Sequence, residues 1–125
     1  MRSLLIILFL STMLCPLRSL GAEEVSSTEK EIAHLLNHIL VSDCKFIRNG
    51  KSYSAKDGHE HVQKKYKHYK KKKKIKTTED FIKYAATKSM LSGKMYHVEL
   101  ADGSQVLLKD WMSEELERLR KSDKE

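Results

Sequence analysis

Nine of the thirteen residues from Lys64 to Lys76 are lysines, and Tyr66 and Tyr69 lie among them. Clustered lysines neutralise phosphates and aromatic rings stack on bases, so the run taken alone would predict nucleic-acid binding. A solvated basic helix face is the alternative interpretation. The lysines that could contact an anionic partner are Lys64, Lys65, Lys67, Lys70, Lys71, Lys72, Lys73 and Lys74.

Four histidines have spacings that raise the question of metal binding. His34 and His38 are four residues apart in a predicted helix, but no glutamate lies between them as it does in a zinc-protease motif. A helical wheel places this pair away from the apolar face, hence in solvent. His59 and His61 flank Glu60, and side chains two residues apart on a helix point in different directions. We therefore predict surface histidines, no metal site and no other cofactor.

Cys44 could act as a nucleophile or a redox centre. A reactive thiol needs an accessible, electropositive environment, and Lys45 and Arg48 are close in sequence. Against this, Cys44 lies at a predicted helix-to-strand junction between core positions, and the chain has no C-x-x-C motif. We expect a buried structural thiol, with a thiol-dependent enzyme, a redox protein and an intermolecular disulfide as the alternatives.

A further group combines polar and aromatic side chains that could contact a ligand. Arg48 and Asn49 lie at the tip of a predicted hairpin, and Tyr53 and Tyr96 lie at strand ends, positions that suit ligand contact. The structural alternative is that the turn requires Asn49 with Gly50 and that the tyrosines only pack. The chain has no glycine-rich phosphate loop and no Ser/His/Asp signature, so the sequence favours a non-enzymatic module.

Helices and hairpins must position these residues. Asn49-Gly50 between short apolar runs is a strong hairpin signal, and the segments SAKD at 54–57 and TTED at 77–80 have the form of helix capping boxes. Ser27 or Thr28 is the expected cap of the first helix. The predicted order is helix 28–42, hairpin 45–53, helix 54–73, helix 77–92, hairpin 96–108 and a closing helix whose apolar side begins at Trp111. This order predicts a small single α+β domain, with about four helices packed on two short antiparallel β-hairpins.

The N-terminal residues have the pattern of a secretory signal peptide. Arg2 precedes an apolar run from Leu4 to Leu14, and small residues follow, so we predict a signal peptide at 1–22, cleaved after Gly21 or Ala22. The apolar run is shorter than the roughly 20 residues that span a bilayer, and we predict no transmembrane segment in the mature chain. Cleavage removes two arginines and no acid, so the formal net charge falls from +7 to +5.

Export changes the interpretation of the lysine run. A periplasmic or secreted protein is separated from nucleic acid, so the predicted partners are an anionic membrane surface, lipopolysaccharide or an acidic protein. The mature chain, residues 23–125, has the length of one domain. Cys44 is then its only cysteine.

Three segments carry a resemblance to a known family: EIAHLLNHILVSDCKFIRNGKSYSA, TTEDFIKYAATKSMLSGKMY and DWMSEELERLR. Together they resemble the YfeK-like family of small secreted bacterial proteins, a domain of unknown function. The resemblance implies a single-domain periplasmic protein of a Gram-negative bacterium and implies no activity. The lysine run departs from it, because the corresponding helix in similar proteins looks less basic. Its most specific positions are Ser42, Cys44, Phe46 to Gly50, Tyr53, Glu79 to Ile82, Ser92-Gly93, Tyr96 and Trp111.

Overall fold

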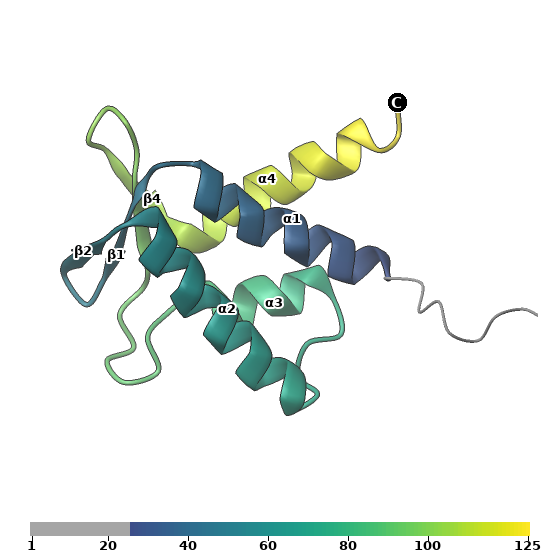
Figure 1. Ribbon diagram of the computed structural model, residues 1–125, viewed down its shortest axis with the longest axis horizontal. Coiled ribbons are helices and arrows are strands. Elements are labelled where there is room, and N and C mark those ends of the chain that lie inside the picture. Colours follow the sequence, from purple (N-terminus) through teal and green to yellow (C-terminus); the bar gives the residue numbers. More distant parts are fainter. Residues whose placement is uncertain (1–25) are drawn as a thin grey trace, which may run out of the picture.

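The computed structural model describes residues 26–125, and the predicted signal peptide lies outside the described residues. Figure 1 shows the short strands at one end of the molecule and the helices extending away from them. The predicted α+β class, with four helices and antiparallel hairpins, is confirmed. The elements are α1 (Ser27–Val41), β1 (Lys45–Arg48), β2 (Lys51–Tyr53), α2 (Ala55–Lys71), α3 (Thr78–Ala85), β3 (His97–Glu99), β4 (Gln105–Leu107) and α4 (Leu108–Ser122).

The two hairpins join into one antiparallel sheet of strand order β2-β1-β3-β4. Asn49 and Gly50 both have positive φ angles, 52° and 76°, as the predicted two-residue turn requires. β1 pairs with β3, which places Phe46 opposite Val98. Both of these side chains are buried, so the joined strands present one apolar face to the helices.

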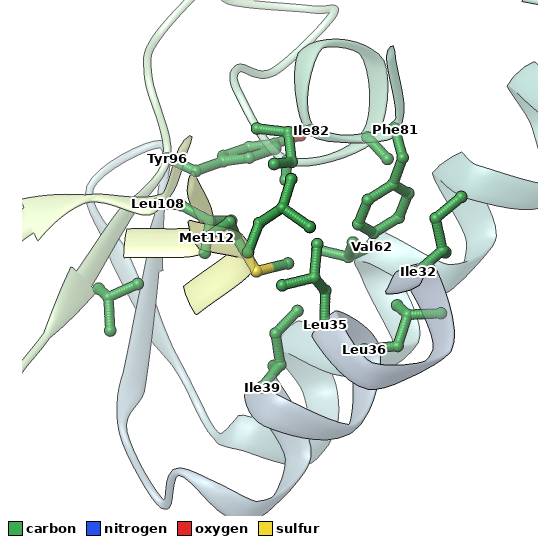
Figure 2. Close-up of a cluster of buried hydrophobic side chains, with 14 of the residues drawn as sticks. Ile32, Leu35, Leu36, Ile39, Val62, Phe81, Ile82, Tyr96, Leu108 and Met112 are labelled. Carbon is green, nitrogen blue, oxygen red and sulfur yellow. The ribbon is translucent and has the colours of Figure 1, made fainter. Parts of the chain in front are cut away.

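The core lies between the helices and this face of the sheet. α1 packs against α2, α3 and α4, and Figure 2 shows its buried side chains facing those of the other helices. Leu35, Ile39, Phe81 and Met112 are all inaccessible to solvent. Ile32, Leu36, Ile39 and Ala85 are therefore buried as their periodicity predicts, whereas Leu40, at the edge of the α1 face, is 45% exposed.

Gly58 allows α2 to approach β1 closely. A Cβ atom at this position would lie 2.8 Å from Cγ of Phe46, well inside van der Waals contact. Any larger residue would force the helix or the ring to move. Gly58 therefore fixes the separation between α2 and β1, which matters because the candidate site lies between these two elements.

The capping-box prediction is confirmed in full at α3, holds for the hydroxyl half alone at α2, and the predicted cap of α1 is wrong. Ser54 Oγ accepts from the amide of Asp57, and Thr77 and Asp80 form a full capping box on α3. At α1 the cap is Ser26, whose Oγ accepts from the amide of Glu29 at 3.1 Å. Neither Ser27 nor Thr28 is the cap.

Helix α3 ends at Ala85, so the predicted end near Ser92 is wrong. Thr87 Oγ donates back to the carbonyl of Ile82, and the Thr87 carbonyl accepts from the amide of Tyr96. These two bonds turn the chain back toward the sheet. In the connection from 86 to 96, Met90 and Leu91 are exposed and take no part in the core.

Helix α2 ends at Lys71, two residues before the predicted end. Lys73 has a φ of 58°, its amide donates to the carbonyl of Lys70, and the amide of Lys74 donates to the carbonyl of Tyr69. This pair of bonds is the Schellman motif, in which glycine usually occupies the left-handed position. A lysine takes that position here.

Candidate functional site

A pocket of about 320 Å³ lies between α2 and the sheet, and we name it the α2–β1 pocket. Its apolar wall includes Phe46 and Val62, from opposite sides of the close approach at Gly58. Its volume is at the small end of the range for ligand sites, roughly 300–1,000 Å³. Besides Phe46, the polar and aromatic side chains lining it are Arg48, Tyr53, Asp57, Glu60, His61, Lys64 and Tyr96.

Three of these side chains form a continuous hydrogen-bond chain. Nη1 of Arg48 lies 2.6 Å from Nδ1 of His61, and Nε2 of His61 lies 2.9 Å from the hydroxyl of Tyr96. A guanidinium can only donate, so Nδ1 must accept. His61 is therefore the neutral tautomer with its proton on Nε2, and that N–H donates to the Tyr96 oxygen.

Lys65, one helical turn after His61, reaches the same hydroxyl. Its Nζ donates to Tyr96 Oη at 3.1 Å and to the carbonyl of Lys88 at 2.7 Å. The ammonium also lies 4.8 Å from the centroid of the Tyr96 ring. Tyr96 Oη thus accepts from two donors, and its own O–H has no acceptor among residues 26–125.

Arg48 has one edge that the protein does not use. Nε is buried and has no hydrogen-bond partner, and no bond joins Nη2 to any residue in the described part of the chain. The guanidinium lies 5.3 Å from the centroid of the Tyr53 ring, which holds it in place through a cation–π contact. The side that carries Nε and Nη2 is the one that binds carboxylates with two parallel hydrogen bonds.

The pocket lining carries charges of both signs, with Arg48 and Lys64 beside Asp57 and Glu60, and cations surround His61. Burial lowers the pKa of His61 to about 4, and the charges of Arg48, Lys65 and Lys64 lower it further in the same direction. Burial likewise lowers the pKa of Lys65 to about 8, with help from Arg48. No ion pair to Arg48 or Lys65 is present in the described residues, so an anion would be favoured beside Arg48 and disfavoured beside Asp57 and Glu60.

The structure brings together three of the four polar and aromatic candidates. Arg48, Tyr53 and Tyr96 line the pocket, whereas Asn49 is engaged elsewhere. Its Oδ1 accepts from Ser92 Oγ and its amide donates to Ser89 Oγ, which ties the hairpin tip to the 86–96 connection. Asn49 therefore has two structural roles: it forms the turn, and it holds the hairpin tip against the 86–96 connection.

Sequence reasoning missed two residues of the site. His61 was predicted to lie on the surface and is instead half-buried against Arg48 and Tyr96, so that prediction is wrong. Lys65 was grouped with the exposed lysines, although its Nζ is directed into the fold. The available signal was the spacing of Gly58, His61, Val62 and Lys65, which places all four on one side of α2.

The remaining lysines form a second feature, the lysine end of α2, defined as Lys67, Lys70, Lys71, Lys72, Lys73 and Lys74. All six are exposed. Lys70 lies 3.4 Å from a carboxylate oxygen of Glu29, and within residues 26–125 the other five have no acidic partner. Lys64 is also exposed but lies at the pocket, toward the other end of the helix.

His34 and His38 do not lie free in solvent, so that prediction is also wrong. Nε2 of His34 lies 2.7 Å from Oε1 of Glu115, and the ring of His38 stacks on Trp111 with centroids 4.1 Å apart. Glu115, on α4, is only 6% exposed and also accepts from Arg118. Helix α4 covers this face of α1, which a wheel of α1 alone cannot reveal.

This cluster is a network of hydrogen bonds and charges centred on Glu115. Within residues 26–125, no group of three or more His, Cys, Asp or Glu side chains is placed to hold a metal ion. Burial acts to raise the pKa of Glu115, but hydrogen bonds from Arg118 and His34 outweigh it and hold that pKa below its usual range. Glu115 is thus charged and links α4 to α1.

Cys44 is a half-buried free thiol, more accessible than the buried thiol we predicted. Its Sγ lies 3.6 Å from the carbonyl oxygen of Ser42, and the side chain packs against the edge of the core. No histidine, lysine or arginine in the described part of the chain forms a hydrogen bond with Sγ. The geometry therefore gives no catalytic partner for a thiolate.

Across residues 26–125, none of the helices combines the length and the apolar character needed to cross a membrane.

Comparison with known proteins identifies the family to which the chain belongs. No curated protein and no solved structure matches the chain. One family model covers the pocket, the lysine end of α2 and the Glu115 network together. The chain therefore belongs to DUF5329, a family of unknown function, whose model matches residues 26–120.

Proposed function

We propose that the protein is an exported, periplasmic, non-enzymatic module whose lysine end binds the phosphate groups of an anionic envelope surface. Support for export comes from the signal-peptide pattern at 1–22 and from the resemblance to YfeK-like secreted proteins. Support for binding comes from one observation: Lys67 and Lys71 to Lys74 are exposed and have no acidic partner in the described residues. Phospholipid headgroups and lipopolysaccharide share the phosphate chemistry that such a cluster recognises.

The magnitude of the attraction is adequate for measurable binding. Each lysine near an anionic membrane contributes on the order of 1 kcal/mol, and the attraction decays within a Debye length. Five lysines without acidic partners therefore give affinity that depends strongly on salt. The position of these lysines at the end of a helix also matters, because the helix C-terminus stabilises cations without requiring a protein acid.

The test is cosedimentation of purified protein with vesicles of phosphatidylglycerol and phosphatidylcholine. The wild type is compared with a variant in which Lys71, Lys72, Lys73 and Lys74 are all changed to Gln. The matched control removes the same charge from exposed lysines elsewhere, by changing Lys45, Lys51, Lys56 and Lys94 to Gln. Binding is measured at about 20–50 mM salt, where screening is weak, and again at higher salt.

We expect the wild type and the control variant to sediment with the vesicles at low salt and to be released as salt rises. The Lys71–Lys74 variant should stay in solution. Equal loss in both variants would show that net charge alone drives the association and would overturn the proposal. A second arm replaces the vesicles with lipopolysaccharide and thereby distinguishes the two sources of phosphate.

Two other results would favour a different function. If the wild type ignores both anionic surfaces but is crosslinked through its lysine end to an acidic protein of the envelope, the partner is a protein. If a Cys44→Ser variant folds normally and abolishes an envelope phenotype, the thiol carries the function and a thiol-dependent enzyme or redox protein becomes the better account.

A further inference from the structure

We propose that the α2–β1 pocket binds a compact monocarboxylate through the unused edge of Arg48, with the apolar part of the ligand against the wall formed by Phe46 and Val62. This inference goes beyond the proposed surface contact and does not depend on it. Asp57, Gly58 and His61, which line the pocket, belong to the first half of α2, and the lysine end belongs to the other. Figure 1 shows the first half of α2 beside the strands and its last turns away from them.

The first support is the orientation of the Arg48 donors. Nη1 is held by His61 at 2.6 Å, and the guanidinium carbon lies 5.3 Å from the centroid of the Tyr53 ring. These contacts position the group, while Nε is buried without an acceptor and no hydrogen bond joins Nη2 to a described residue. A buried N–H that lacks an acceptor is unfavourable, so a group that supplies one is bound with a gain beyond its own contacts. A carboxylate can accept from both nitrogens at once.

The second support is the hydroxyl of Tyr96. Because it accepts from His61 and Lys65, its own proton is available to a ligand. The pocket therefore presents N–H and O–H donors from two elements that are far apart in the chain. Arg48 has no carboxylate partner in the part of the chain that the structure describes, so a single negative charge would be favoured beside its guanidinium.

The third support concerns the size and charge of the ligand. A volume of about 320 Å³ admits a small molecule and excludes a polymer chain. Asp57 and Glu60 also line the pocket, so a dianion such as a phosphate monoester or a dicarboxylate would meet two like charges. A ligand with one carboxylate can accept from the donors, and its compact apolar or aromatic body can pack against the apolar wall. Its single charge meets less repulsion from Asp57 and Glu60 than two charges would.

The experiment follows the amide resonances of ¹⁵N-labelled protein during titration with acetate, benzoate and 3-phenylpropionate, with methyl benzoate as the neutral control. We expect saturable shifts of Gly58 and His61 with benzoate or 3-phenylpropionate, weaker binding of acetate, and no response to methyl benzoate. Arg48→Lys keeps the positive charge but loses the two-nitrogen edge, so it should weaken binding at least about ten-fold. Arg118→Lys, outside the pocket, is the matched control.

The proposal is overturned if none of the three carboxylates shifts these resonances, if the neutral ester binds as well as benzoate, or if Arg48→Lys binds as the wild type does. Thermal melting of each variant shows whether it remains folded. If Arg48→Lys unfolds, Glu60→Gln supplies the test: it should strengthen benzoate binding by removing a like charge from the pocket lining, and unchanged or weaker binding would overturn the proposal. The Lys71–Lys74 variant should bind benzoate unchanged, so this result and the vesicle result can fail separately.

Discussion

Nη1 of Arg48 and Nδ1 of His61 lie 2.6 Å apart and join an inner strand of the sheet to helix α2. The bond requires a neutral imidazole, because an imidazolium would offer a proton where a lone pair is needed. Two consequences follow for His61: its tautomer is fixed, and its protonation is opposed by both burial and neighbouring cations.

The first prediction concerns pH. The pKa of His61 is about 4 in the folded protein and about 6.5 in its ordinary state. Between these values the unfolded chain binds a proton that the folded protein does not, so stability falls as the pH is lowered from 6.5 to 4. Denaturant unfolding across this range should show a steeper loss for wild type than for His61→Gln. Equal slopes would show that His61 titrates normally, and an imidazole titration by NMR gives the same answer directly.

The second prediction concerns Gly58→Ala. Alanine is about 1 kcal/mol better than glycine in a helix interior, but overpacking costs about 1–3 kcal/mol. The new Cβ would lie 2.8 Å from the Phe46 ring, so we expect a net loss of about 1 kcal/mol in the free energy of unfolding and a displaced α2. Exposed Glu60→Ala on the same helix should be nearly neutral. A stabilised Gly58→Ala protein would mean that the two elements separate easily.

The third prediction concerns Glu115→Gln. Glu115 is 6% exposed and accepts from His34 and Arg118. Hydrogen bonds to a charged group contribute about 1.5–3 kcal/mol, but Arg118 is exposed, so we expect a loss of about 1–2 kcal/mol. Its lowered pKa means that this contribution is present above the ordinary carboxyl pKa and is lost as the pH falls below it. Glu114→Gln, at an exposed neighbouring position, should leave stability unchanged.

The fourth prediction concerns the left-handed residue that ends α2. A non-glycine residue in this conformation costs about 1–2 kcal/mol, and Lys73 has a φ of 58°. Lys73→Gly should therefore raise the free energy of unfolding by about 1 kcal/mol after the entropy of the unfolded chain is counted. Lys71→Gly, at the last residue of α2, should lower the free energy of unfolding. If Lys73→Gly also lowers the free energy of unfolding, the Schellman bonds do not hold the turn beyond α2.

Local signals account for what the sequence could predict. The Asn49-Gly50 turn and the caps at Ser54 and Thr77 depend on residues within a few positions of one another. The end of α3 was less predictable, because Thr87 bonds to both Ile82 and the distant Tyr96. Propensity alone carries no signal for such a contact.

The candidate site depended on contacts between distant segments. His61 and Tyr96 meet only because the two hairpins join through β1 and β3. Glu115 resembled its exposed neighbours in sequence, and its burial follows from the crossing of α1 over α4. In both cases the residue type was visible and its environment was not, since that environment is set by a second element far along the chain.

The pairing of β1 with β3 also has a kinetic consequence. Phe46 lies opposite Val98, so forming this ladder closes a long loop, and the entropy of that closure must be met before the contacts form. We expect the local units, the β1–β2 hairpin with α2 and the β3–β4 hairpin with α4, to form first and to join late. The donors of Arg48 and Tyr96 face one pocket only after that step, so a molecule bound there would select the completed fold and raise its melting temperature.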